Sequence, residues 1–239
     1  MEYDERLTAI DDEVRRLGYA FRAVHRTARV PTCPDWTLAD LAAHVGQFAA
    51  LWTHVLCEAS GSEKTPYAPL GADDDMADWF EPLANHLLDA LRATTADAPC
   101  WTWIPDEQNA GCVARRAANE LSFHRYDAQS AGGATTQLDP AVAADSIDEI
   151  FVMIPAWGNP PEGSGLSLHL HGLEGGEWTI TLPPEGPQVV HEHVPADIKL
   201  TGTASDLALL LFQRPTIGPV DRAGEAAALD AWYREFLFD

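Results

Sequence analysis

The sequence predicts an α+β protein, with a helical N-terminal part followed by a small unit that contains strands. Apolar residues recur every three or four positions, the spacing of amphipathic helices, in three N-terminal segments: 4–27, 38–57 and 76–94. Apolar and polar residues instead alternate in 166–171 and 178–182, and a Gly-Gly pair between these two segments indicates a β-hairpin. These patterns predict two domains, residues 1–157 and 158–239.

Helix breakers and capping residues separate the predicted elements. Pro31 and Pro34 interrupt the helical pattern, and Thr37 then stands as an N-cap with Asp40 in a capping-box position. Segments rich in Gly, Pro and polar residues, 60–75 and 155–165, predict loops. The remaining expected elements are helices over 115–128, 140–153, 207–212 and 224–236, and strands over 188–193 and 197–201.

The formal charge of −22 at pH 7 narrows the possible partners. Such an excess of carboxylates repels nucleic acid phosphates and anionic membrane surfaces. No apolar run approaches the roughly 20 residues that span a bilayer, and the start of the chain is acidic, unlike a signal peptide. We therefore expect a cytoplasmic monomer or homodimer that binds small molecules, without nucleic acid or membrane partners.

The segment 115–128 carries the most informative polar residues. It is rich in helix-forming residues and free of Gly and Pro, so we expect a helix that ends before Gly132. Glu120 and His124 are four residues apart, a spacing that places two potential metal ligands on one helix face. With Arg116 and Asp127 they also fit a solvated row of ion pairs. A third ligand from another helix would favour the metal.

His44 is the candidate for that third ligand. It lies between Leu41 and Phe48 on the apolar side of the helix over 38–57, so its side chain points inward. A single inward histidine is more often a hydrogen-bonded core residue than a ligand. With Glu120 and His124, however, it completes a set of three, the number that a catalytic zinc takes. Zinc is the expected ion, although the same donors suit other divalent metals.

Four further histidines offer an alternative metal site in the C-terminal part. His169 and His171, and likewise His191 and His193, are two residues apart, which in a strand places both members of a pair on one face. No acidic residue accompanies the first pair within 166–171. Histidines on an exposed face would explain the same pattern, so the helix-borne site is preferred.

Several stretches across the chain form a further pattern when they are taken together. They are VPTCPDWT (30–37), DLAAHVG (40–46), WTW (101–103), RRAANE (115–120), HR (124–125), DA (127–128) and GTASDLALLLFQR (202–214). Together these stretches resemble the mycothiol-dependent maleylpyruvate isomerase family. Two positions depart from the family pattern: Asp35 replaces a usual glycine, and Gln213 replaces a residue that is commonly small.

The resemblance implies a DinB-like four-helix bundle followed by a small SCP2-like α+β domain. His44, Glu120 and His124 fall on the metal-ligand positions of the family, and Arg214 falls near a C-terminal arginine of its active site. The implied activity is that of a zinc-dependent enzyme that uses mycothiol as cofactor or cosubstrate, as an isomerase or a thiol S-transferase. In such an enzyme the metal removes the proton of the thiol, and the thiolate is the nucleophile.

Two other functions fit the same ligands. A metal-dependent hydrolase would use zinc-bound hydroxide, but the sequence has no HExxH motif and no extra glutamate beside the ligands to act as a base. A non-catalytic metal-binding or ligand-binding protein would keep the helices without the reaction. An open coordination position would distinguish an enzyme from such a protein.

Overall fold

The computed structural model describes residues 1–58, 67–156 and 163–236, and its chain forms two compact units, Met1–Thr136 and Gln137–Asp239. The expected domain boundary after residue 157 falls outside the described residues. The division after Thr136 assigns the fifth helix to the second unit, whereas the sequence pattern grouped it with the first four. In the described ranges, no helix combines the length and hydropathy that a membrane span requires.

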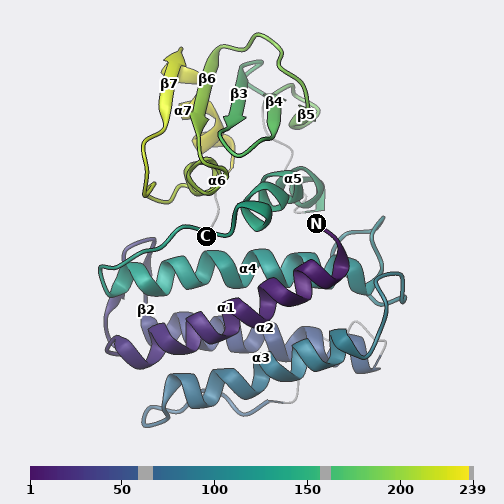
Figure 1. The fold of residues 1–239 in the computed structure, drawn as a ribbon, viewed down its shortest axis with the longest axis vertical. Helices are drawn as coiled ribbons and strands as arrows, with labels where there is room; N and C mark the ends of the chain where they lie inside the picture. The colour runs from purple at the N-terminus through teal and green to yellow at the C-terminus, as the bar shows by residue number, and fades with distance from the viewer. Residues whose placement is uncertain (59–66, 157–162, 237–239) are drawn as a thin grey trace. The chain divides into compact units, whose positions relative to one another are not determined.

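Four helices form the first unit: α1 (Tyr3–Ala23), α2 (Leu38–Glu58), α3 (Met76–Arg92) and α4 (Ala110–Ala131). They lie side by side (Figure 1), with α1 packed on α3 and α4, and α2 packed on the same two helices. Each contributes fully buried apolar residues to one core, among them Leu17, Val45, Leu87 and Leu121. The predicted helical N-terminal part of an α+β protein is confirmed.

A short antiparallel hairpin, β1 (Arg29–Val30) and β2 (Cys33–Thr37), precedes α2. The sequence predicted only an interruption here, since two prolines and very short strands leave no alternating pattern. The predicted capping box is present at the start of α2. The Thr37 backbone N–H donates to the Asp40 carboxylate at 2.8 Å, and the Asp40 N–H donates to the Thr37 hydroxyl at 3.3 Å.

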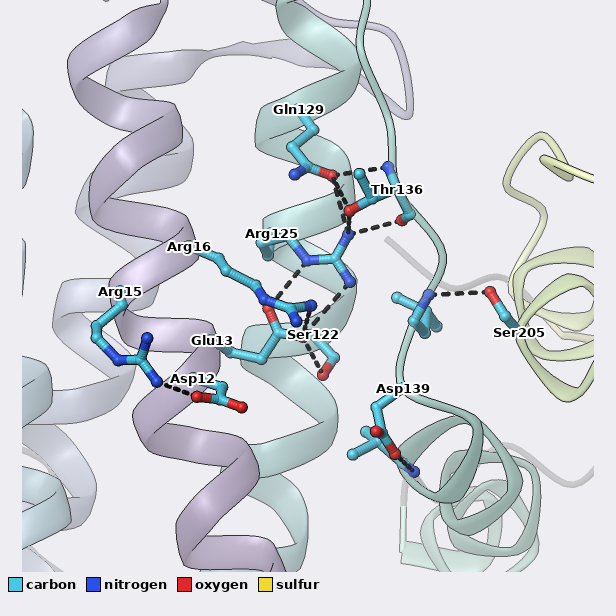
Figure 2. Close-up of polar contacts among 12 residues, drawn as sticks. Asp12, Glu13, Arg15, Arg16, Ser122, Arg125, Gln129, Thr136, Asp139 and Ser205 are labelled. Carbon is cyan, nitrogen blue, oxygen red and sulfur yellow. Dashed lines mark hydrogen bonds and ion pairs between the residues drawn. The ribbon is translucent and has the colours of Figure 1, made fainter.

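A buried ion pair joins α1 to α4. The Arg125 side chain is fully buried, and its Nε donates to Glu13 Oε2 at 2.9 Å, while the Ser122 hydroxyl donates to the other Glu13 oxygen at 3.3 Å (Figure 2). Arg125 Nη1 also donates to Gln129 Oε1 at 2.9 Å and to the Thr136 carbonyl at 2.7 Å. These contacts satisfy both charges inside the unit, as buried charges require.

In its described residues, 137–156 and 163–236, the second unit consists of a five-stranded sheet and three helices. The sheet order is β5-β4-β3-β6-β7, in which β3 and β6 run parallel and every other neighbouring pair is antiparallel. Helices α6 and α7 pack on β3 and β6, and α5 packs on α6 (Figure 1). The elements are α5 (Pro140–Ala156), β3 (Ser167–Gly172), β4 (Glu177–Thr181), β5 (Gln188–Val190), β6 (Ile198–Gly202), α6 (Ala204–Leu211), β7 (Asp221–Gly224) and α7 (Ala226–Glu235).

Two details of this sheet differ from the prediction. Strand β5 ends at Val190, so the expected strand over 188–193 is too long and the segment after it leaves the sheet. Strand β7 was not predicted, because all four of its residues are exposed and therefore show no alternation of apolar and polar positions. The predicted hairpin of β3 and β4 is confirmed, with Leu168 and Ile180 paired and fully buried.

We predict that Glu13→Ala lowers the free energy of unfolding by about 3–5 kcal/mol, because it leaves the Arg125 charge buried without this partner. Urea denaturation followed by circular dichroism measures the change. The matched control is Asp12→Ala, which removes the exposed ion pair with Arg15 (Figure 2) and should cost about 1 kcal/mol or less. If the two substitutions lowered the free energy of unfolding equally, the buried ion pair would not stabilise the first unit more than the exposed pair does, and the prediction would be wrong.

Candidate metal centre

Helices α2 and α4 bring His44, Glu120 and His124 together. Glu120 Oε1 lies 2.9 Å from His44 Nε2 and 3.2 Å from His124 Nε2. The two imidazole rings stand edge to face, with centroids 4.8 Å apart. The capping box positions His44 by fixing where α2 begins, and Asn109 does the same for α4, since its side chain accepts from the Cys112 N–H at 3.0 Å.

Glu120 is a carboxylate surrounded by cationic and hydrogen-bonding groups. Its second oxygen pairs with Arg116, one helical turn earlier on α4. Burial raises the pKa of Glu120, but Arg116 and His124 outweigh burial and hold the pKa well below its usual range. Glu120 is therefore ionised at neutral pH and offers a negatively charged oxygen ligand.

Asp127 orients His124. Its Oδ2 lies 3.0 Å from His124 Nδ1, on the side of the ring away from Glu120, and the buried thiol of Cys33 lies 3.9 Å from the same oxygen. Metal-bound histidines usually have such a partner on their other nitrogen. From the sequence, an ion pair of Asp127 with Arg125 or Arg22 is favoured slightly over such an orienting role. Nearby arginines pair elsewhere: Arg125 with Glu13, and Arg22 with Asp78 and Glu81.

The two carboxylates also set the charge of His124. Burial lowers the pKa of His124, but Glu120 and Asp127 outweigh burial and raise the pKa to about 9. The ring is thus protonated at neutral pH, and a metal ion that uses Nε2 as a ligand must displace a proton. The side chains of Glu120 and His124 are only 15% and 6% exposed. These residues therefore do not form the solvated row of ion pairs that their spacing would also allow.

The β1–β2 hairpin covers one side of the cluster. The Trp36 ring lies 4.9 Å from the His44 ring and 6.2 Å from the His124 ring, measured between centroids. The sequence pattern did not single out Trp36, because the hairpin that carries it was not predicted. The His44 side chain is 38% exposed, so the cluster remains open to solvent on the side of α2.

The donor set fits a divalent metal ion. One atom each of His44, Glu120 and His124 can be chosen so that all three lie within 4.8 Å of one another. In a tetrahedral zinc site with bonds of about 2.0–2.1 Å, ligand atoms lie about 3.3 Å apart, close to the observed 2.9 and 3.2 Å. Two imidazoles and a carboxylate also suit zinc among the divalent ions.

Three tryptophans form a cluster at α2. Trp52 of α2, two helical turns after His44, stacks on Trp101 at 6.0 Å and meets Trp103 edge to face at 4.8 Å. Trp101 and Trp103, from the segment before α4, are 38% and 42% exposed, an unusual state for large aromatic residues. They form a partly exposed aromatic surface against the helix that carries His44.

Arg214 belongs to the second unit and follows α6. It is 7% exposed, and its Nη1 donates to the Phe212 carbonyl at 3.0 Å. Gln213, which departs from the family pattern, adopts a left-handed φ of 59°, and its side chain donates to the Phe236 carbonyl at 2.7 Å. This turn fixes the backbone from which Arg214 projects.

Family models match both parts of the chain. The model of the mycothiol maleylpyruvate isomerase N-terminal domain matches residues 7–129, and the model of the C-terminal domain of the same family matches residues 141–231. The candidate ligands lie within the first match and Arg214 within the second. No similar protein was found among curated sequences.

Two solved structures have the same fold. One is a mycothiol-dependent maleylpyruvate isomerase and the other is a histidine-to-alanine mutant of such an enzyme; their TM-scores are 0.61 and 0.64. Each is 17% identical to this chain, and the alignment covers 94% of this chain and 95% of the other. With one model matching more than half of the chain and a second matching most of the rest, this chain belongs to the mycothiol-dependent maleylpyruvate isomerase family.

Proposed function

We propose that this chain is a zinc-dependent enzyme that uses mycothiol or a related low-molecular-weight thiol, as an isomerase of the maleylpyruvate type or a thiol S-transferase. The observation that carries the proposal is the convergence of His44, Glu120 and His124, from two helices, on one point. Family membership and the fold of the two similar isomerases support it.

Each residue around that point has a distinct task in this proposal. His44, Glu120 and His124 would hold the ion through Nε2, Oε1 and Nε2, the atoms that lie together. Arg116 keeps Glu120 ionised, and Asp127 accepts from His124 Nδ1–H so that Nε2 faces the ion. Trp36 shields one side of the ligands from water, while the exposed part of His44 lies on the side from which a thiol enters.

A bound zinc ion would lower the pKa of a thiol presented to it, which is ordinarily near 8.5, so that the thiolate predominates at neutral pH. Such a thiol would supply a nucleophile that can add reversibly to a conjugated cis double bond, as an isomerase requires, or that can stay attached through a carbon–sulfur bond, as a transferase requires. Both reactions use the thiol as the nucleophile.

Arg214 is proposed to bind the substrate carboxylate. A planar guanidinium binds a carboxylate through two parallel hydrogen bonds, which a lysine cannot reproduce. Its burial and the fixed turn at Gln213 limit the orientations open to the side chain. Such a group selects small organic acids as substrates.

We expect His44→Ala and His124→Ala each to abolish zinc binding at this centre, so that each variant holds one zinc ion fewer per chain than the wild type, and to leave the helical content unchanged, since the apolar core of the bundle does not include either ring. Metal analysis of the purified variants and circular dichroism measure the two properties. His54→Ala, on the same helix α2 but outside the cluster, is the control and should retain the metal. Retention of zinc at this centre by His124→Ala would refute the assigned ligands.

The activity test uses maleylpyruvate as the substrate, with and without mycothiol. We expect conversion only when the thiol is present, and a loss of about 100-fold or more in His44→Ala, because that variant loses a ligand of the ion. The reaction is followed by absorbance, and products are identified by mass spectrometry. Turnover that is independent of thiol, or hydrolysis of an amide substrate in its place, would favour the hydrolase and exclude the proposal.

For Arg214→Lys we expect the KM for the organic acid to rise about tenfold, because the lysine keeps the charge but loses the paired hydrogen bonds. The KM for the thiol should stay the same, which separates substrate binding from a general loss of structure. Arg222→Lys, at an exposed position of β7, is the control. An unchanged KM for the acid in Arg214→Lys would remove Arg214 from the substrate site.

A further inference from the structure

A second cluster of metal-ligating side chains lies in the second unit, on strands β3 and β4 and the segment that follows β5. His169 Nε2 lies 2.5 Å from Glu177 Oε2 and 3.2 Å from His193 Nδ1. One nitrogen or oxygen of each residue lies within 4.8 Å of the others. The donor set, two imidazoles and one carboxylate, is the same as in the first unit.

Strand geometry brings the first two residues together. His169 and His171 lie two residues apart on β3, and in the antiparallel pairing with β4, Glu177 stands opposite His171 and diagonal to His169. All three side chains project from the face opposite to Leu168 and Leu170, which are fully buried. The acidic ligand that is missing from residues 166–171 thus comes from the neighbouring strand.

Thr179 holds the third residue in place. Its hydroxyl donates to the Glu192 carbonyl at 2.8 Å and accepts from the Val194 N–H at 3.3 Å, so it binds the backbone on both sides of His193. Thr179 is itself buried, and it pairs with His169 across the β3–β4 ladder. These two hydrogen bonds attach the segment after β5 to strand β4 on both sides of His193, and they thereby direct the His193 side chain toward His169.

Hydrogen bonding at this point depends on a single proton. His169 is 2% exposed, and its Nε2 faces both the Glu177 carboxylate and His193 Nδ1. One ring nitrogen carries at most one proton, so an Nε2–H of His169 would have to be shared between the Glu177 carboxylate and the Nδ1 lone pair of His193. A cation between the three atoms would accept a lone pair from each of them.

We propose that His169, Glu177 and His193 form a second divalent metal site, selective for zinc and similar ions that prefer imidazole ligands. The observed nitrogen–nitrogen separation of 3.2 Å is close to the roughly 3.3 Å between ligands of a tetrahedral zinc ion. Glu177 is partly exposed and His193 is exposed, so an ion can reach the site from solvent.

Two neighbouring histidines have other roles in this site. His171 Nδ1 lies 2.6 Å from the second oxygen of Glu177 and orients the carboxylate, as partners of metal-bound carboxylates do. His191 lies outside the cluster, and its Nε2 is instead 3.5 Å from Asp148. The bound ion would fasten the segment after β5 to strands β3 and β4.

The test is a zinc titration of the full chain in competition with a chromogenic chelator. A chain with both His44→Ala and His124→Ala removes the candidate metal centre of the first unit, and we expect it to bind one zinc ion. Adding His193→Ala should abolish that binding, and adding Glu177→Gln should weaken it by at least about tenfold. Both residues are at least partly exposed, so the sheet should remain folded in these variants.

His191→Ala is the matched control, since it removes a histidine two positions away that contacts Asp148. In the chain that already carries His44→Ala and His124→Ala, it should leave the zinc affinity unchanged, and zinc should raise the melting temperature with His191→Ala but not with His193→Ala. The proposal is overturned if the chain without His44 and His124 binds no zinc, or if His191→Ala and His193→Ala weaken binding equally. A wild-type chain that binds one ion, lost in His193→Ala alone, would support this site and contradict the first.

Discussion

Helix α4 buries charged side chains, and every buried charge must meet a partner from elsewhere in the fold. Arg125 meets Glu13 of α1, and Glu120 meets His44 of α2 as well as Arg116 and His124 of its own helix. These contacts fix how α1 and α2 are placed along α4. The packing of the first unit and the geometry of the candidate metal centre therefore depend on the same helix.

Much of the first unit follows from local sequence rules. The spacing of Glu120 and His124 predicted a shared helix face, and Thr37 with Asp40 predicted the start of α2; the structure agrees with both. The position of Trp36 could not be predicted, because it depends on a hairpin of two very short strands. Whether His44 was a core residue or a ligand also depended on tertiary packing, which its apolar spacing alone does not determine.

In the second unit, strand pairing likewise could not be predicted from the local sequence. The alternation in 166–171 predicted that His169 and His171 share a face, and this is confirmed by the burial of Leu168 and Leu170. Glu177 becomes their neighbour only through the register of β3 and β4, which no local pattern specifies. Strand β5 ends before His191 and His193, and the two then have different partners, Asp148 for His191 and His169 for His193.

The convergence of three side chains from α2 and α4 on one ion can be tested with a crystal grown with zinc. Diffraction measured at the zinc absorption edge locates the metal by its anomalous scattering, without reference to the protein. We expect a peak about 2.0–2.2 Å from His44 Nε2, His124 Nε2 and a Glu120 oxygen. An absent peak there, with Glu120 still hydrogen-bonded to both imidazoles, would contradict it.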